Sequence, residues 1–459
     1  MQAAPTENPT TTPFRPTSTA KGRFPLDLLL QLRRDPLALF EQLKREHGDV
    51  VRFRIARAGV WLVSDPELIK DVFTTHNASF VKGRGLERAK VLLGQGLLTS
   101  ERDFHLRQRR MAQPAFHRQR IAGYAEVMVD EAERTDALWT AGSGSVDMMH
   151  EMMRLTLAIV AKTLFGANVD AETVEIEEAL SKIMPIFADV SLPFADLLQK
   201  LPLPRYRRFR AACRRLDETV YRMIERGRKS GGPGDLLSML LSARDSEGDG
   251  TGMNDVQVRD EVMTLFLAGH ETTANALSWT FYLLGQNPDV ERALHEELAQ
   301  VLGTRRASAA DFGALPYTTA VVSEAMRLYP PAWIISRKAV EPVLLGGHLI
   351  PAQDIVVVSP WVMHRDARYF AEPLQFNPGH FLGDAKAGRP KYAYFPFGGG
   401  TRQCIGEGFA WMESVLVLAT LARKWRARVT PGHPIATQPL ITLRPRYGVG
   451  MTLERRMDA

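Results

Sequence analysis

The order of hydrophobic and polar residues predicts helices along most of this chain. Asp35-Pro36 and Asp65-Pro66 each place an N-cap acid before a proline at the first helical position, which marks a helix start. From Asp103 to about Lys229 the pattern is almost all helical, and Tyr317 to Leu328 predicts another helix. The stretch from about Asp255 to Gln286 has no proline. At about 1.5 Å per residue its helix would be about 48 Å long, enough to cross the whole molecule.

Short strands are expected near both ends of the chain. Val50 to Ile55 and Val60 to Val63 alternate or run apolar, with Ala58-Gly59 between them. Three more short strands are expected at Val343 to Leu345, His348 to Ile350 and Ile355 to Val358. A glycine-rich loop then leads into an apolar helix that ends near Trp425, and a last hairpin follows it.

These elements predict a mainly α protein with small β-sheets, in one domain that spans residues 23–459. No internal repeat and no change of composition divides that range. Residues 1–22 are rich in proline and threonine and lack the apolar core of a signal peptide, so a disordered tail is expected there.

Composition changes this picture only through charge and cysteine content. The formal net charge is +6, but Lys and Arg alternate with acids and no dense basic run occurs, which argues against nucleic-acid binding. A basic face that docks an acidic protein is the better interpretation. Only two cysteines occur, Cys213 and Cys404, so disulfides do not hold the fold. The longest apolar run, Val415 to Ala422, is shorter than a membrane span, and we expect a cytoplasmic protein without membrane insertion.

The strongest chemical signal is the loop from Phe397 to Gly406, with the sequence FGGGTRQCIG. Glycines let a backbone turn tightly and approach a flat cofactor, and nearby N–H groups can stabilise a Cys404 thiolate. Arg402 can reach an anionic group, and the following helix places its positive end near the sulfur. Taken alone, the loop is also open to an inert buried cysteine, a nucleophilic cysteine or a phosphate loop, although the residues of a phosphate loop are missing.

This loop resembles the haem-binding signature of the cytochrome P450 family, F-x-x-G-x-R-x-C-x-G, at every defined position. The resemblance implies that Cys404 is the thiolate ligand of a haem iron. It assigns contacts to haem b (iron protoporphyrin IX) to Phe397, Gly398, Arg402 and Gly406. It covers roughly residues 24 to 454 and implies a triangular, mainly helical fold, with the haem between the long helix and the helix after the cysteine loop.

The long helix carries a second motif, Ala268-Gly269-His270-Glu271-Thr272-Thr273. Glycine inside a helix costs roughly 0.5–1 kcal/mol relative to alanine, and threonine hydroxyls can bend a helix, so the stretch is either a local groove or a tolerated glycine. It is similar to the family motif (A/G)-G-x-(D/E)-T. The resemblance places Ala268 and Gly269 against the haem, Thr272 in a hydrogen bond to the bound oxygen, and Glu271 in the proton relay.

Three basic residues resemble the family's contacts to the haem propionates. His105 and Arg109 are spaced i, i+4 and share one helix face, which by itself also fits a solvated basic helix. They match the family's H/W-x-x-x-R. Arg337, after Pro330-Pro331, matches another propionate arginine, and guanidinium–carboxylate pairs are bidentate and strong.

Glu324 and Arg327 form an acid–base pair at i, i+3, which alone fits a weak surface ion pair. The pair resembles the family's E-x-x-R, which lies buried behind the cysteine loop and braces it. The family's third partner comes from an F-x-P-x-R-F-like segment, here Phe376 to Phe381. His380 occupies the usual arginine position and can still hydrogen-bond to Glu324.

The resemblance implies a monooxygenase that activates O2 with two electrons and inserts one oxygen atom into an apolar substrate, by hydroxylation or epoxidation. No flavin or iron–sulfur motif occurs, so electrons are expected from a separate ferredoxin or flavodoxin and its reductase. Docking is expected on the Cys404 side, where Arg107 and Arg110 would be free. The alternatives are a peroxygenase, in which Arg-Pro would replace Glu271-Thr272, and a haem sensor or electron carrier, with His270 as a second ligand.

The substrate pocket is expected between several segments, while the kind of apolar substrate stays open among fatty acid, terpenoid, steroid and macrolide. By resemblance the walls come from the loop Gly83 to Leu98, helices near Phe187 to Leu197, the long helix, the segment after Pro331 and the last hairpin. The apolar residues expected to line it are Phe266, Leu267, Trp333, Ile334 and Leu440.

Overall fold

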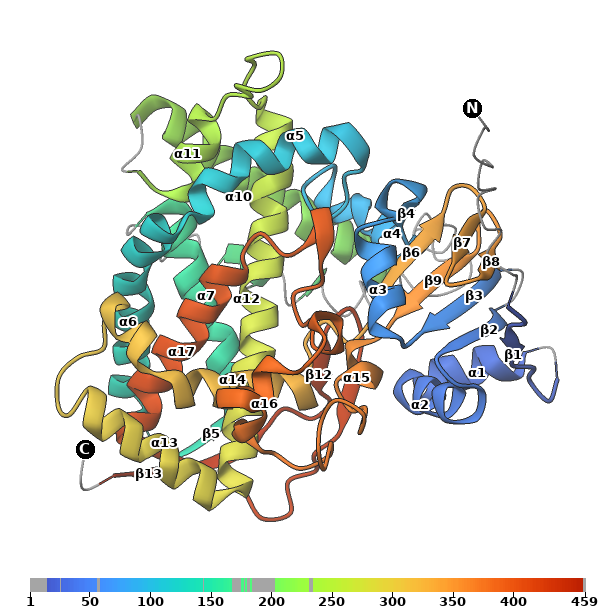
Figure 1. Ribbon diagram of the computed structural model, residues 1–459. Coiled ribbons are helices and arrows are strands. Elements are labelled where there is room, and N and C mark those ends of the chain that lie inside the picture. The colour runs from blue at the N-terminus through green and yellow to red at the C-terminus, as the bar shows by residue number, and fades with distance from the viewer. Residues whose placement is uncertain are drawn as a thin grey trace, which may run out of the picture.

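Long helices make up most of the molecule, and a smaller part rich in strands lies at one side of them (Figure 1). The computed structural model describes residues 15–456, except residues 25, 56–57, 143, 231–233 and the segment 167–202, of which only 175, 176, 178, 179, 182 and 183 are described. The mainly α fold with small sheets is therefore confirmed. The pocket helices predicted near Phe187 to Leu197 lie outside the described residues.

The larger part is built around α12 (Asp255–Gln286), whose predicted bounds are confirmed. Its N-terminus is a capping box, in which Asn254 Oδ1 accepts from Gln257 N and Gln257 Oε1 accepts from Asn254 N, both at 2.9 Å. Around it lie α4 (Arg84–Leu93), α5 (Arg102–Ala112), α6 (Arg118–Ala141), α7 (Met148–Phe165), α10 (Pro204–Ser230), α11 (Leu236–Ser242), α13 (Pro288–Val301), α14 (Pro316–Leu328) and α17 (Glu407–Lys424).

Three hydroxyls of α12 are satisfied within the helix itself. Thr272 Oγ1, Ser278 Oγ and Thr280 Oγ1 each donate to the carbonyl four residues earlier, at 2.7, 2.6 and 2.7 Å. The helix can therefore carry polar side chains through the largest apolar core of the protein, which it shares with α6, α7 and α17. This places the Ala268–Thr273 motif in the interior of the molecule.

The strand-rich part contains a six-stranded sheet in the order β1-β2-β3-β9-β6-β4. Its strands are β1 (Ser18–Thr19), β2 (Val50–Ile55), β3 (Ala58–Val63), β4 (Phe80–Lys82), β6 (Ile335–Ala339) and β9 (Ile355–Val358). The helices of this part are α1 (Asp27–Arg34), α2 (Pro36–His47) and α3 (Pro66–Phe73). The predicted caps are present, since Asp35 Oδ1 accepts from Ala38 N and Asp65 Oδ1 from Leu68 N, both at 3.0 Å.

Smaller elements complete the fold. The hairpins are β7 (Val343–Leu345) with β8 (His348–Ile350), and β11 (Thr437–Pro439) with β12 (Leu443–Pro445). A three-stranded sheet joins β10 (Trp425–Val429), β13 (Gly450–Arg455) and β5 (Ser145–Asp147). Two short helices are α15 (Pro360–Met363) and α16 (Gly383–Ala387). Among the described residues, no helix combines the length and the apolar character that a membrane crossing requires.

Three boundaries differ from the prediction. Ser18 and Thr19 pair with β2 and Ala20 is 6% exposed, so the disordered tail predicted for residues 1–22 is wrong over its last residues. The strand β3 begins at Ala58 rather than at Val60. A Cβ on Gly59 would lie 2.3 Å from Asp354 Oδ1, so this glycine permits a close side-chain approach within the strand rather than a turn. Most of the segment predicted as a loop from Gly83 to Leu98 is the helix α4.

Candidate active site

The segment from Phe397 to Gly406 forms a tight loop before α17. Gly398 and Gly400 have φ values of +72° and +67°, which favour glycine. A Cβ on Gly400 would lie 1.9 Å from the carbonyl oxygen of Phe73 at the end of α3. The Cys404 N–H donates to the Phe397 carbonyl at 3.0 Å and closes the loop. The loop is therefore fixed both within itself and against the strand-rich part.

The Cys404 side chain has a mixed environment. The residue is exposed by surface area, yet burial by the surrounding protein raises the pKa of its thiol to about 11. The backbone N–H of Gly406 opposes this rise, as does the guanidinium of Arg109. A sulfur that faces a recess lined by protein has both an accessible surface and a pKa raised by burial. The accessible surface therefore shows that another group can reach the sulfur.

Basic side chains gather beside this loop. Arg109 Nη1 donates to the Gln403 carbonyl at 2.7 Å, and Arg402 Nη1 donates to the Ser100 carbonyl at 2.8 Å. Lys82, at the end of β4, stands directly across from Arg337 on β6 in the antiparallel register. Like charges at facing positions of a sheet are destabilising unless a counter-charge lies between them. The sequence analysis missed Lys82, and its register opposite Arg337 could not be read from the chain.

In this cluster the basic side chains outnumber the acids. Burial, followed by the charge of Arg402, lowers the pKa of Arg337 to about 10, of Lys82 to about 6 and of His105 to about 3. Lys82, Arg337 and His105 are only 8%, 9% and 2% exposed. Glu101 is the acid that pairs with Arg402. A group with further carboxylates would be stabilised here.

The motif on α12 is mostly buried but is accessible at Ala268. Ala268 is exposed and Thr272 is partly exposed, although most neighbouring positions of the helix are buried. A Cβ on Gly269 would lie 3.1 Å from Val160 Cγ2, so the glycine allows α7 to approach α12 closely here. His270 is 1% exposed, and its Nδ1 lies 2.9 Å from the Phe266 carbonyl oxygen within the same helix.

Glu271 is tied to the last hairpin. Its carboxylate is 5% exposed, and Oε1 accepts hydrogen bonds from Arg444 Nε at 2.7 Å and from Thr442 Oγ1. Burial raises the pKa of Glu271, but the hydrogen bonds and positive charge of Arg444 outweigh this, so the pKa lies below its ordinary value. No short motif marks Arg444 or Thr442, and the sequence analysis missed both.

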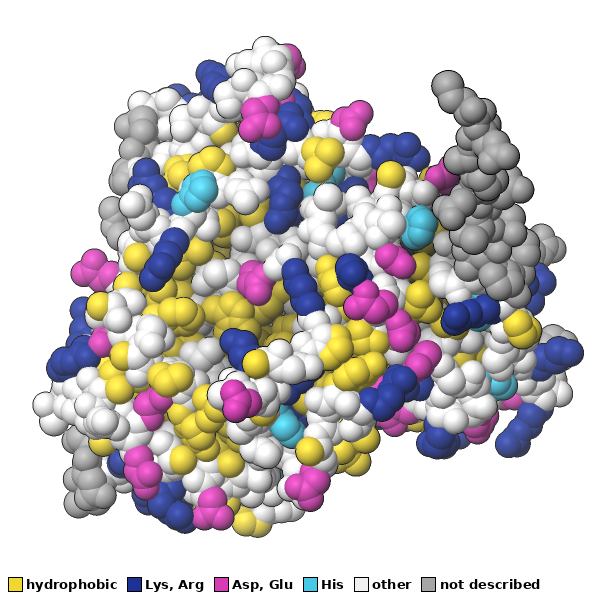
Figure 2. Space-filling view, viewed as in Figure 1, with side chains coloured by type: hydrophobic (Ala, Val, Ile, Leu, Met, Phe, Trp, Pro, Cys, Tyr) yellow, Lys and Arg dark blue, Asp and Glu magenta, His cyan; other side chains and the backbone are white. Residues whose placement is uncertain are grey.

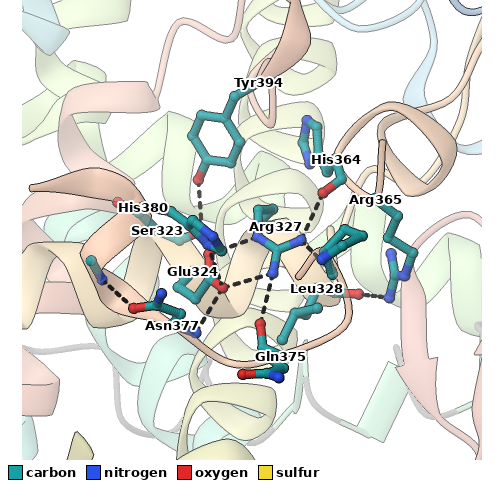
Figure 3. A network of polar contacts seen from close by, with 12 residues as sticks. Ser323, Glu324, Arg327, Leu328, His364, Arg365, Gln375, Asn377, His380 and Tyr394 are labelled. Carbon is teal, nitrogen blue, oxygen red and sulfur yellow. Dashed lines mark hydrogen bonds and ion pairs between the residues drawn. The ribbon is translucent and has the colours of Figure 1, made fainter. Parts of the chain in front are cut away.

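Glu324 and Arg327 lie at the centre of a buried polar network (Figure 3). Both side chains are 0% exposed, and Arg327 Nε and Nη2 each lie 2.7 Å from a different oxygen of Glu324. His380 Nδ1 lies 3.1 Å from Glu324 Oε1, and His380 Nε2 lies 2.8 Å from the Ala371 carbonyl oxygen. The family's third position is therefore filled by a histidine that contacts the same acid.

The network reaches the cysteine loop through His364. Arg327 Nη1 donates to the His364 carbonyl at 2.8 Å, and His364 Nε2 accepts from the N–H of Phe395 at 3.0 Å. Tyr394 adds a second link, because its hydroxyl donates to the Ser323 carbonyl at 2.9 Å. Phe395 lies two residues before Phe397, so the buried pair is joined to the start of the loop. The sequence analysis missed His364 and Tyr394, which belong to no motif.

Comparison with known proteins identifies the family of the chain. Residues 24–449 match the Cytochrome P450 family. The chain belongs to the cytochrome P450 family. It is a monooxygenase of the kind that uses haem iron, O2 and redox partners.

Several curated relatives are similar over nearly the whole chain. Cyclooctatin synthase of Streptomyces melanosporofaciens is 42% identical, over 95% of this chain and 95% of its own. Cyclooctat-9-en-7-ol 5-monooxygenase of the same organism is 36% identical, over 94% and 92%. Pentalenene oxygenase of Streptomyces avermitilis is 34% identical, over 93% and 94%.

The residues of this P450 fit a haem. A porphyrin brings two carboxylates, which match the excess positive charge of Lys82, Arg337 and their neighbours. Cys404 supplies a soft ligand whose sulfur is accessible. Gly398 and Gly400 keep side chains away from the loop surface. The chain thus offers both an iron ligand and a propionate site.

Two expected roles do not agree with the structure of this P450. Arg107 and Arg110 are not free for docking, because Arg110 Nη2 lies 3.0 Å from Asp245 Oδ1 and Arg107 Nη2 donates to Thr251 Oγ1 at 2.7 Å. Phe266 and Trp333 are 2% and 6% exposed and pack in the core, so they do not form an open wall. Leu267, Ile334 and Leu440 are partly exposed and stay candidates for that role.

Proposed function

We propose that this P450 binds haem b through Cys404 and inserts one oxygen atom from O2 into a cyclic terpene-type hydrocarbon or its alcohol, by hydroxylation or epoxidation. The observation that carries the haem assignment is the loop that presents Cys404 beside a cluster of buried basic side chains, with Lys82 facing Arg337 across two strands. The substrate class is carried by the relatives, whose names specify a cyclooctatenol and pentalenene. The catalytic unit is the domain at residues 23–459.

Each group of residues in the site has its own role in the proposed reaction. Haem held by a cysteine thiolate supplies O2 activation, with electron donation from sulfur that favours O–O cleavage. Lys82, His105, Arg109, Arg337 and Arg402 would hold the propionates. Thr272 on α12 has a hydroxyl that donates to the Ala268 carbonyl at 2.7 Å. This hydroxyl can exchange that partner for a group on the substrate side. Glu324, Arg327 and His380 brace the loop.

Electrons come from a separate ferredoxin or flavodoxin with its reductase, and the docking site lies at the start of α6. Phe116 faces the end of the cysteine loop and Ile121 faces the start of α17, since a Cβ on Gly406 or Gly408 would meet them at 3.9 and 3.0 Å. Arg118 and Arg120 are exposed beside them, without an ion pair to any part of the chain that the structure describes. These two arginines suit an acidic partner. Figure 2 shows hydrophobic side chains in the middle of the face it presents, with charged side chains of both signs around them.

The reduced, CO-bound absorption spectrum tests the assignment of Cys404. Wild-type protein reconstituted with haem b should give the thiolate-type spectrum, and Cys404→Ser should lose it because no soft anionic ligand remains. Cys213→Ser is the matched control, since Cys213 lies on α10 and burial raises its pKa to about 12. Loss of the spectrum in the control and its retention in Cys404→Ser would overturn the proposal.

Substrate-binding spectra test the substrate class. Cyclic terpene hydrocarbons and their alcohols should shift the spectrum at low concentrations, and straight-chain fatty acids of equal carbon number should not. Turnover under isotopically labelled O2 should then give a product that carries one labelled oxygen atom. Label from peroxide alone would instead favour the peroxygenase alternative.

A further inference from the structure

The Glu271 carboxylate on α12 is held by two side chains of the hairpin β11–β12. Arg444 Nε and Thr442 Oγ1 both donate to Oε1, and Arg444 lies 173 residues beyond Glu271 in the chain. We propose that Arg444 and Thr442 are positioning residues that clamp the Glu271 carboxylate, so that the hairpin controls when this acid can deliver protons past Thr272. This inference rests on the proposed monooxygenase function.

The clamp is buried and connected on both sides. Glu271 and Thr442 are 5% and 6% exposed, and Asn275, one turn further along α12, is 0% exposed. Asn275 Nδ2 donates to the Glu271 carbonyl at 3.0 Å and to Thr442 Oγ1 at 3.2 Å. Thr442 therefore accepts from one residue of α12 while it donates to another, which fixes the direction of its hydroxyl.

The hairpin that carries the clamp is attached to the expected substrate walls. Leu443 N donates to the Pro331 carbonyl at 3.0 Å, and Trp333 Nε1 donates to the Leu440 carbonyl at 2.9 Å. The turn residue between the wall and the clamp, Ile441, is 46% exposed. A substrate that presses on Leu440 or Ile441 would displace the backbone that holds Thr442 and Arg444.

The attachment of the hairpin affects when Glu271 can be protonated. A carboxylate paired with a guanidinium stays ionised, so it cannot donate a proton until the pair loosens. Once Arg444 moves away, Glu271 can take a proton from a hydronium ion of the solvent at one oxygen and pass it toward Thr272, the next residue, which returns Glu271 to the carboxylate; the same cycle delivers a second proton. The clamp would hold back proton delivery until the hairpin has shifted.

Few other charges act on Glu271. Among the described residues, the charged or titratable groups that influence it are Arg444 from β12 and His270 from its own helix. Arg446, two residues after Arg444, is exposed and stacks its guanidinium 5.4 Å from the centre of the Tyr447 ring. Arg446→Gln is therefore a matched control that removes a nearby arginine without touching the clamp.

The first test measures unfolding and does not depend on turnover. Arg444→Gln should lower the denaturant midpoint, because it leaves the Glu271 charge buried without its partner. In a Glu271→Gln background the same substitution should cause a much smaller shift, and Arg446→Gln should cause none. Equal midpoint shifts from Arg444→Gln in the two backgrounds would overturn the clamp.

The second test uses pH. In the wild type the pKa of Glu271 is lowered, so the pair contributes stability above the ordinary pKa of 4.5 and this contribution is lost as pH falls through the lower, folded-state value. In Arg444→Gln only Thr442 and His270 still oppose burial, which is the largest influence, so the pKa should rise and the sign of this pH dependence should reverse. Arg444→Lys should restore the wild-type sign, since it keeps the positive charge.

The third test compares product with released peroxide across pH. The pH at which the yield of product changes should move upward in Arg444→Gln by about one unit or more, and Arg444→Lys should bring it back. An unchanged profile in a folded, haem-loaded Arg444→Gln protein would overturn the proposal. Failure of the proposed function would show separately, as absence of the thiolate-type CO spectrum in the wild type, while the unfolding test would still report on the clamp.

Discussion

His380 Nδ1 lies 3.1 Å from Glu324 Oε1, in the place where the family usually has an arginine. The histidine can serve because its other nitrogen lies 2.8 Å from the Ala371 carbonyl oxygen. Arg389 restores a guanidinium nearby, since its Nη2 donates to the His380 carbonyl at 2.7 Å and its Cζ lies 4.1 Å from the centre of the Phe370 ring. The positive charge that is missing at position 380 is therefore supplied nearby by Arg389.

Breaking the buried Glu324–Arg327 pair should unfold the protein or release its haem. Arg327→Ala leaves Glu324 charged in the core and should cost about 3–5 kcal/mol of unfolding free energy, with loss of bound haem. Asp289 and Arg292 on α13 provide the control, because they have the same i, i+3 spacing but their side chains are 91% and 65% exposed. Arg292→Ala should cost less than about 1 kcal/mol. The His380→Arg variant should keep its haem. Similar losses of unfolding free energy in Arg327→Ala and Arg292→Ala would contradict the bracing role of the buried pair.

Loss of the Thr272 hydroxyl should uncouple electron use from product formation. Thr272→Ala should still consume reduced nicotinamide through its redox partner but release more peroxide and less product, by about tenfold or more, because a positioned proton donor is missing. Thr280→Ala is the control, since its hydroxyl makes the same bond to the carbonyl four residues earlier at 2.7 Å. Unchanged product yield in Thr272→Ala would show that the proton travels elsewhere.

Charge reversal at the start of α6 should slow electron delivery. Arg118→Glu with Arg120→Glu should reduce the rate of reduction several-fold at low salt, and the difference should shrink as salt screens charges over about 8 Å. Arg33→Glu with Arg34→Glu on α1 is the control, because these exposed residues lie on the strand-rich side of the molecule (Figure 1). Stopped-flow reduction at several salt concentrations measures this, and equal slowing in both variants would exclude a specific site.

A buried acid in α17 should make stability depend on pH. Glu413 is 0% exposed, and burial raises the pKa of its carboxyl from 4.5 to about 8. Thr273 opposes this only in part, because its hydroxyl donates to the Gly269 carbonyl at 3.2 Å. The folded state therefore holds a proton that the unfolded state releases above pH 4.5, so this group lowers stability as pH rises from 4.5 to about 8.

Glu413→Gln should remove this slope. The variant should be more stable than the wild type at pH 8 by about 1.4 kcal/mol or more, since one pKa unit corresponds to about 1.4 kcal/mol. At pH 4 the two proteins should have similar stability, because the wild-type carboxyl is then protonated in both states. Chemical unfolding at the two pH values measures the difference, and a wild type that is the more stable at pH 8 would show that the Glu413 charge has a partner.

Local patterns predicted local structure well. The bounds of α12 and of the strands β7, β8 and β9 follow from proline, glycine and apolar periodicity, which act over a few residues. The cysteine loop was readable because its glycines and Cys404 are contiguous. The same holds for the buried pair, since Glu324 and Arg327 lie on one turn of α14.

Contacts between residues far apart in the chain could not be predicted from the sequence. Arg444 reaches Glu271 only because the last hairpin folds back on α12, and Lys82 faces Arg337 only because β4 pairs with β6. Arg107 and Arg110 have the sequence of free surface arginines, yet the turn after α11 brings Asp245 to them. Charge alone does not indicate whether a side chain meets solvent or an acid from a distant segment.

The contact between Gly400 and the Phe73 carbonyl has a consequence for recombining this P450 with its relatives. A Cβ at position 400 would lie 1.9 Å from that oxygen, so the cysteine loop and α3 tolerate almost no change in their separation. A chimera that takes residues 66–73 from one parent and residues 397–406 from another must reproduce this fit without either parent having been selected for it. Crossover points that inherit both segments from the same parent should give far more folded, haem-loaded hybrids than points that separate them.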